Sequence, residues 1–274
     1  MILVVATTED GLADVHSRLR RVGVASTEVV APGGARRLVL AAVDDEAAGH
    51  RLVARLRADG VMAVLRPVAG ARLEAWSRHT MPVTIGGRLS VCFAWSEHDR
   101  RDLGDAIELD PGGGFGTVDH PATRLLLEEL VERVTGGERV LDVGCGSGVL
   151  GLCALRLGAS KMVGVDIDPG ALVATRRNAT LNGVDHHVVA TARPLDEIEG
   201  DFDIVVANIG RAGIVALAPE LIGHVAPGGW LAVSGFSPAQ CPLVTAVLAP
   251  LDVLASRVRG EWSALVLSPQ RTDA

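Results

Sequence analysis

Apolar and polar residues alternate along the first 68 positions in a way that predicts a small mixed domain. Four short apolar runs predict strands at residues 2–6, 27–30, 38–43 and 61–65. Between them, apolar residues recur every three to four positions after Asp10 and after the acidic run 44–46, which predicts two helices, the first capped by Asp10. The order β-α-β-β-α-β is the ferredoxin-like pattern, so residues 1–68 are expected to form a ferredoxin-like α+β domain.

A different rhythm begins near residue 101. Apolar strand-like runs alternate with helix-like segments, which are expected at 125–134, 149–157, 171–181 and 214–222. The strands are expected at 140–143, 162–166, 204–207, 230–235, 253–258 and 263–267. This alternation predicts an α/β domain, doubly wound and Rossmann-like, over residues 101–274. Residues 69–100 are expected to be a linker that contains a short helix at 72–78 and a hairpin.

Composition and charge exclude several classes of protein. The 274 residues are 48% hydrophobic and 22% charged, which indicates a folded chain. The net charge of −7 argues against a general nucleic-acid surface, so no direct nucleic-acid partner is expected. The sequence has no apolar run long enough to span a membrane, and its first residues resemble a strand more than a signal peptide. Four scattered cysteines fit a reducing compartment, so we expect a cytoplasmic protein without a metal site.

The strongest chemical signal is a glycine-rich turn between a predicted strand and helix, in which Asp142 precedes Gly144, Gly146 and Gly148. Glycines let the backbone approach a ligand closely, and the start of the helix offers free N–H groups. The dinucleotide fingerprint would require a glycine at position 149, where this chain has valine. A carboxylate at position 142 would also repel a pyrophosphate but not a cationic sulfonium. We therefore predict S-adenosylmethionine as the cofactor, with Asp142 facing its methionyl end.

Two acidic residues follow the next predicted strand. Asp166 lies at the carboxyl end of that strand, where it is placed to accept hydrogen bonds from both ribose hydroxyls. Asp168 precedes Pro169, which is the pattern of a helix N-cap. We therefore expect Asp166 to bind the cofactor and Asp168 to be structural.

Asn208 ends another buried strand, where its amide oxygen is placed to accept an N–H from an attacking amine; the alternative is a turn residue that caps the next helix. The glycine-rich segment 110–124 carries Thr117, Asp119, His120 and Thr123. This segment is either a loop that folds over the cofactor or an ordinary entry to a helix capped by Thr123. Cys145 lies within the glycine turn, and loop packing explains it better than a role as nucleophile.

These motifs together resemble the PrmA family of ribosomal protein methyltransferases. The resemblance rests on the segment Gly116-Thr117-x-x-His120-Pro121-x-Thr123, the glycine turn, the run beginning at Asp166, and Asn208 with the following isoleucine. It extends to the N-terminal region, to Trp76 and Trp95, and to residues 82–89, and thus covers nearly the whole chain.

The resemblance implies a fold, an activity and a set of site residues. Cofactor contacts would fall on Thr123, Gly144, Asp166 and Asn208, while Thr117 and His120 would lie on a loop that covers the site. The activity would be methylation of amines on a ribosomal protein, a lysine side chain or the N-terminal amine, and the N-terminal domain would recognise that protein. Asn208 would orient the amine, with Thr117 and His120 as further catalytic residues. Asp119, Asp110 and His120 remain alternative proton acceptors.

The chain departs from the family pattern at four positions. Val118 and Ala122 replace a glycine and a threonine, and Gly210 with Arg211 replace the usual residues after the Asn-Ile pair. These changes favour a second hypothesis, in which the acceptor is a small-molecule amine such as an amino acid or a secondary metabolite. Arg211 would then pair with a carboxylate or phosphate of this substrate; the alternative is that Arg211 is simply solvated. A third hypothesis, from another class, is an interaction protein that binds the cofactor without catalysis.

Overall fold

The computed structural model describes residues 2–8, 10–22, 24, 27–30, 36–43, 46–66, 82–94, 106–110, 118 and 120–270. Its contacts divide the chain into two compact units, Met1–Pro82 with Phe93–Asp102, and Val83–Cys92 with Leu103–Ala274. Val83–Cys92, which we expected in the linker, thus group with the second unit. The helix expected at 72–78 and the residues Trp76, Trp95, Thr117 and Asp119 lie outside the described residues.

The N-terminal unit is a four-stranded sheet with two helices. Its elements are β1 (Ile2–Thr8), α1 (Leu12–Arg21), β2 (Glu28–Val30), β3 (Arg36–Ala42), α2 (Glu46–Ala58) and β4 (Ala63–Arg66). The sheet order is β2-β3-β1-β4, with antiparallel pairs throughout. The predicted cap of the first helix is wrong, because the N-cap is Gly11 and no side chain caps it.

One apolar core holds both helices of this unit on the same face of the sheet. Leu3 and Val5 alternate along β1 and therefore point to one face. Leu19 of α1 and Leu56 of α2 join the same cluster. The described part of this unit therefore has the two-layer form expected of a small α+β domain.

The second unit is built on a seven-stranded sheet of order β10-β9-β8-β11-β12-β14-β13. Its strands are β8 (Arg139–Val143), β9 (Lys161–Val165), β10 (Val188–Thr191), β11 (Phe202–Asn208), β12 (Val225–Phe236), β13 (Asp252–Arg259) and β14 (Trp262–Ser268). The first five strands along this order are parallel, and β14 and β13 pair antiparallel. A second sheet contains β5 (Val83–Ile85), β6 (Leu89–Phe93) and β7 (Ile107–Leu109).

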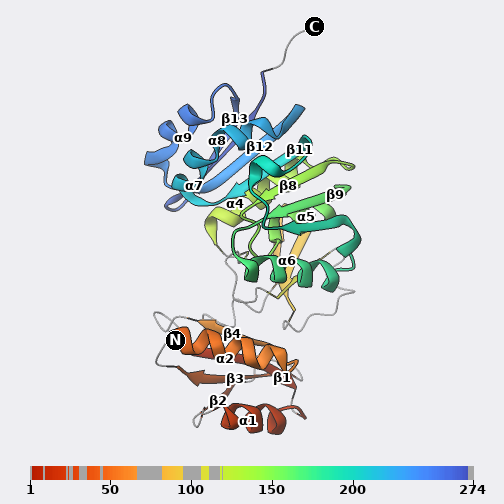
Figure 1. The fold of residues 1–274 in the computed structure, drawn as a ribbon, viewed down its shortest axis with the longest axis vertical. Helices are drawn as coiled ribbons and strands as arrows, with labels where there is room; N and C mark the ends of the chain where they lie inside the picture. The colour runs from red at the N-terminus through yellow and green to blue at the C-terminus, as the bar shows by residue number, and fades with distance from the viewer. Residues whose placement is uncertain are drawn as a thin grey trace. The chain divides into compact units, whose positions relative to one another are not determined.

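Helices cover both faces of the large sheet, as the doubly wound prediction requires (Figure 1). One face packs against α4 (Pro121–Arg133), α5 (Val149–Arg156) and α6 (Pro169–Leu181). The other face shares an apolar cluster with α7 (Gly210–Ala216), α8 (Ala218–Gly223) and α9 (Cys241–Val247). Three short 3₁₀ turns complete the unit, at Asp185–His187, Leu195–Glu197 and Pro238–Gln240. No helix within the described part of the chain is long and apolar enough to cross a membrane.

The single helix predicted at 214–222 is in fact two helices, α7 and α8. Pro219 lies in the first turn of α8 and has no N–H with which to continue the ladder of α7. Leu217 closes α7 through its N–H to Gly213 O, and its own carbonyl accepts from Leu221 N. The break between the two helices therefore falls at Leu217, and both helices pack on the sheet.

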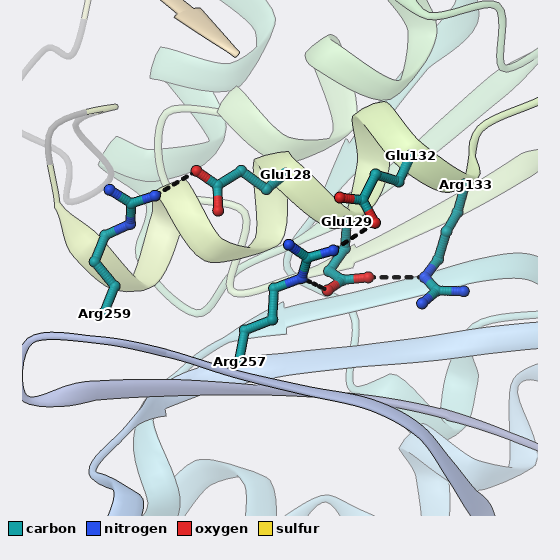
Figure 2. A network of polar contacts seen from close by, with 6 residues as sticks. All are labelled: Glu128, Glu129, Glu132, Arg133, Arg257 and Arg259. Carbon is teal, nitrogen blue, oxygen red and sulfur yellow. Dashed lines mark hydrogen bonds and ion pairs between the residues drawn. The ribbon is translucent and has the colours of Figure 1, made fainter. Parts of the chain in front are cut away.

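An ion-pair network fixes α4 against the edge strand β13 (Figure 2). Its centre is Glu129, whose side chain is 1% exposed and whose carboxylate pairs with Arg133, 2.7 Å away, and with Arg257 of β13. Arg257 also reaches Glu132, and Arg259 pairs with Glu128 at 2.5 Å. Helix α4 begins at the segment that carries the predicted residues His120 and Thr123, so this network helps to position them.

Candidate functional site

A cavity of about 790 Å³ opens at the carboxyl ends of the parallel strands. Strands β9 and β10 lie on one side of β8, while β11 and β12 lie on the other. The connections therefore reverse direction between β8 and β11, and open α/β sheets bind their ligands at such a switch point. The sequence-predicted residues that line the cavity are Thr123, Gly144, Gly146, Asp166 and Asn208.

The glycine turn forms the floor of the cavity, and its shape depends on glycine. Gly144, Gly146 and Gly148 all have positive φ, at 70°, 55° and 80°. A Cβ on Gly144 would lie 2.2 Å from Ile209 Cγ2. Any residue larger than glycine would therefore clash with Ile209, which directly follows β11. Gly148 is the N-cap of α5, which directs the first N–H groups of that helix towards the turn. Gly148 itself shapes the turn without lining the cavity.

Asp166 joins the end of β9 to the glycine turn. Its Oδ2 accepts from Gly146 N at 2.9 Å, and its Oδ1 accepts from Asp168 N at 3.0 Å. A carboxylate has further lone pairs, so Asp166 retains the capacity to accept from a ligand in the cavity. Asp168 caps α6 through Gly170 N at 2.8 Å with Pro169 in the first turn, which confirms its predicted structural role.

Asn208 and Thr123, which both line the cavity, contact each other although they are far apart in the sequence. Asn208 Nδ2 donates to Thr123 Oγ1 at 3.1 Å. The N-cap of α7 is Ile209, and no side chain caps that helix, so the alternative reading of Asn208 as a helix cap is wrong. The amide oxygen of Asn208 lies beside Gly235, 3.2 Å from where a Cβ on that glycine would be.

Asp142 is not among the residues that line the cavity, although its neighbours Val143 and Gly144 are. A contact between Asp142 and the cofactor, directly or through water, stays a prediction. Its side chain is 1% exposed, and its Oδ2 accepts from Gly151 N in α5 at 3.0 Å. Burial raises the pKa of Asp142 to about 7, the Gly151 hydrogen bond opposes this rise, and the charge of Asp166 adds to it. Asp142 thus anchors the helix behind the glycine turn, because the strand side chain points into the sheet–helix interface.

His120 is the N-cap of α4 and also lies outside the cavity lining. Its Nδ1 accepts from Ala122 N at 3.3 Å, and its ring packs edge-on against Trp262 with centroids 4.6 Å apart. Burial lowers its pKa, which favours the neutral imidazole. The alternative that Thr123 caps this helix is therefore wrong. Thr117 lies outside the described residues.

Two further candidates lack the environment that reactivity requires. Cys145 lines the cavity, but burial raises the pKa of its thiol to about 12, so it is not a thiolate nucleophile at neutral pH. Asp110 is 2% exposed and pairs with Arg177 at 2.6 Å, outside the cavity lining. Over the part of the chain that the structure describes, no three His, Cys, Asp or Glu side chains are grouped to hold a metal.

The sequence did not predict two groups of residues that line the cavity. The first group follows β10 and contains Ala192, Arg193, Pro194, Leu195 and Asp196. The second group comes from α7, α8 and the residue between them, and contains Gly213, Leu217 and Glu220. The first group carries a signal that the sequence offers, because it follows the third parallel strand as Asp166 follows the second. The second group has no such signal, since its orientation depends on the break at Pro219.

Comparison with known protein families shows to which family a chain with this cavity belongs. The family model described as "Ribosomal protein L11 methyltransferase (PrmA)" matches residues 71–270, which include the whole cavity. The chain belongs to the PrmA family. It is 43% identical over 197 residues to the ribosomal protein L11 methyltransferase of Citrifermentans bemidjiense, and 44% identical over 200 residues to that of Ralstonia pickettii.

These PrmA relatives are matched over only part of their length. The matched segments are 69% and 70% of this chain and 64% and 65% of the two relatives. Among solved structures, the ribosomal protein L11 methylase of Lactobacillus delbrueckii subsp. bulgaricus aligns with a TM-score of 0.64 and 29% identity. That alignment covers 69% of this chain and 99% of the other, and it confirms the Rossmann-like methyltransferase fold.

S-adenosylmethionine is the cofactor of this methyltransferase family, and the cavity fits it. The glycine turn offers backbone close to the cavity without Cβ atoms, and Asp166 offers a carboxylate for hydroxyl groups. The cavity volume lies in the range of sites for ligands of this size. The predicted choice of S-adenosylmethionine over a dinucleotide is therefore confirmed.

Proposed function

We propose that this chain is an S-adenosylmethionine-dependent N-methyltransferase that acts on an amine of a ribosomal protein, as the names of its relatives suggest. The observation that carries the proposal is the convergence of the glycine turn, Asp166 and Asn208 on one cavity at the switch point. The acceptor is a lysine side chain or the N-terminal amine of the protein. A cytoplasmic location follows from a ribosomal acceptor.

The cofactor would be held by Thr123, Gly144, Gly146, Asp166 and Asn208, which all line the cavity. Asp166 would accept from the ribose hydroxyls, and the glycine turn would carry the rest of the molecule on its backbone. Asp142 and Gly148 would act indirectly. Asp142 would fix the start of α5, and Gly148 would fix the shape of the turn.

S-adenosylmethionine supplies a methyl group on a positively charged sulfur, which is already an activated leaving group. The protein must therefore supply mainly alignment and exclusion of water. Asn208 would orient the neutral amine, because its amide oxygen can accept an N–H while Thr123 holds its nitrogen. His120 and Asp119 stay alternative proton acceptors, with Thr117 beside them in the sequence. The ring nitrogen Nδ1 of His120 is already engaged with Ala122, which weakens that candidate.

The N-terminal unit would be a ferredoxin-like domain that recognises the protein substrate. Its element order and its sheet order β2-β3-β1-β4 support the ferredoxin-like assignment. Recognition is supported by the cavity itself, since among the described residues every one that lines it belongs to the second unit. A separately packed unit that contributes no lining residue is best explained by a role in binding the partner.

Arg211 supports a second candidate acceptor. Its side chain is exposed in the first turn of α7, three residues after Asn208. A guanidinium at this position would pair with a carboxylate or phosphate on a small-molecule amine. A third candidate, a cofactor-binding interaction protein without catalysis, predicts binding of S-adenosylmethionine but no methyl transfer.

The test offers the purified protein labelled S-adenosylmethionine together with either unmethylated ribosomal protein L11 or a panel of small amines. Mass spectrometry of host ribosomes with and without the gene provides the matching measurement in cells. Transfer to the ribosomal protein alone supports the first candidate, and transfer to a small amine alone supports the second. Binding of S-adenosylmethionine without methyl transfer to either kind of acceptor would support the third candidate, the interaction protein.

A pair of variants separates cofactor binding from acceptor placement. Asp166→Ala should weaken S-adenosylmethionine binding by about 1–3 kcal/mol, because a charged hydrogen-bond acceptor is lost. Asn208→Ala should lower turnover much more than it lowers cofactor affinity. Calorimetric titration and initial rates measure the two effects. Unchanged affinity in the first variant, or normal turnover at saturation in the second, would refute the corresponding role.

A further inference from the structure

Two asparagine side chains, one in α6 and one at its C-cap, hold the short strand β7. Asn178 Oδ1 accepts from Asp110 N at 2.8 Å, and Asn178 Nδ2 donates to Asp110 O at 3.1 Å. Asn182 repeats the arrangement with Glu108, with its Oδ1 2.8 Å from the backbone nitrogen and its Nδ2 2.7 Å from the carbonyl oxygen. Each side-chain amide thus pairs with both polar backbone groups of one residue, as a neighbouring strand would.

The match between helix and strand follows from their geometry. Asn178 and Asn182 are four residues apart, so they lie on one face of α6 with a rise of about 6 Å between them. Glu108 and Asp110 are two residues apart, which corresponds to about 6.6 Å along a strand and returns the backbone groups to the same side. The two amides therefore fit alternate residues of the segment without distortion of either element.

The two asparagines differ in their remaining hydrogen bond. Asn178 Nδ2 also donates to Ser147 O at 2.8 Å, which lies inside the glycine turn. Asn182 Nδ2 donates instead to Asn178 O, within its own helix, at 2.8 Å. Thr175, one turn earlier in α6, supports the same turn through Gly146 O at 3.0 Å. Asn178 is completely buried, so a lost hydrogen bond there is not replaced by bulk water.

We infer that Asn178 is a positioning residue that holds the glycine turn in the conformation that binds the cofactor and couples that turn to the end of β7. The inference rests on the proposed function, since it concerns the affinity for S-adenosylmethionine. Asn182 makes the same kind of contact with β7 but has no bond to the turn, and it serves as the matched control.

The experiment compares full-length Asn178→Ala and Asn182→Ala with the unmodified chain. Both variants lose a pair of bonds to β7, but Asn178 is completely buried and Asn182 is only partly buried, so we expect the larger fall in melting temperature for Asn178→Ala. Only Asn178→Ala should raise the Kd for S-adenosylmethionine, by roughly five- to tenfold, as expected for one lost buried hydrogen bond. If Asn178→Ala does not fold, Asn178→Asp keeps an acceptor for Asp110 N. It loses both donations by Nδ2, to Asp110 O and to Ser147 O, and places a carboxyl oxygen against those two carbonyl groups.

A second measurement does not depend on the cofactor. Hydrogen exchange of the amides at residues 144–148 should quicken in the Asn178 variant and stay unchanged in the Asn182 variant. Equal effects of both variants on exchange at the turn, or on Kd, would overturn the inference. If the unmodified chain fails to bind S-adenosylmethionine while the exchange difference persists, the proposed function fails and the positioning role stands.

Discussion

The two units of the chain bury different kinds of side chain. In the described part of the N-terminal unit, every buried side chain is apolar, for example Leu3, Leu19 and Leu56. The second unit has an apolar core of its own but also buries polar groups, which are Asp110, Thr123, Glu129, Asp142, Ser147, Thr175, Asn178, Ser234 and Ser263.

This difference reflects what each core has to do. An apolar core stabilises through area and volume, which are not directional. A buried polar group costs free energy unless it is hydrogen-bonded, but the bond fixes one geometry. The polar groups concentrate around the glycine turn, in Asp142, Ser147, Thr175 and Asn178, and along α4. We conclude that the second unit uses directional contacts where the cavity must keep its shape.

The largest effect is expected in the apolar core. Leu19→Ala removes a fully buried side chain from the cluster that joins α1 to the sheet. The cavity left behind should lower the free energy of unfolding of this unit by about 3–4 kcal/mol. Chemical denaturation, with hydrogen exchange of α1 and β1 to assign the loss to this unit, measures it.

The apolar core of the N-terminal unit should tolerate a substitution that keeps the volume of the side chain. Leu19→Met keeps the volume and should cost less than about 1.5 kcal/mol. Neither Leu19 variant should change the affinity for S-adenosylmethionine, because all cavity residues belong to the second unit. A loss of affinity comparable to that of Asp166→Ala would break the division of roles between the two units.

The next effect concerns the ion pairs of Figure 2. Arg257→Ala leaves the buried carboxylate of Glu129 with Arg133 as its remaining arginine partner in that network. We expect a loss of about 2–3 kcal/mol of unfolding free energy, since a buried charge loses part of its compensation. Thermal and denaturant unfolding provide the measurement.

Arg259→Ala is the matched control for this prediction. Arg259 also reaches from β13 to α4, but its partner Glu128 is 22% exposed, and such pairs contribute about 1 kcal/mol or less. Equal losses in the two variants would mean that the burial of Glu129 has no energetic consequence. The network would then be a surface feature rather than part of the polar core.

The smallest effect is a pH dependence at Asp142. Its pKa of about 7 in the folded chain lies above that of the unfolded chain, so the folded state retains a proton that the unfolded state releases. The stability contributed by this group is therefore present at low pH and is lost as the pH rises to 7. Asp142→Asn keeps an acceptor for Gly151 N and does not titrate. Its stability relative to the unmodified chain should rise by about 1–2 kcal/mol between pH 5 and pH 6.

Denaturation curves at several pH values test this prediction. Asp201→Asn, at an exposed position outside the cavity lining, removes a carboxyl group from the surface and is the control. A flat difference for Asp142→Asn would show that the carboxyl group is ionised in the folded chain at pH 5. The charge of Asp142 would then be compensated by a contact other than the Gly151 hydrogen bond.

Much of the second unit could be predicted from local patterns in the sequence. Apolar runs located four of its five parallel strands and missed β10, and the Asp168–Pro169 pair predicted the start of α6. The glycine turn, Asp166 and Asn208 were found because each follows a strand, and a parallel sheet brings strand ends to one edge. Asp142 could not be placed in the same way, because the side chain of a strand residue next to the turn can face either the ligand or the helix.

The sequence by itself thus determined the elements, the class of fold and the cofactor, because periodicity and turn chemistry act over a few neighbouring residues. Only the tertiary structure decided which side chains meet. The bond between Asn208 and Thr123, the ladder from Asn178 to β7 and the Glu129 network join residues 68 to 128 positions apart. Such contacts depend on the order of strands and the packing of helices, and no local pattern along the chain encodes them.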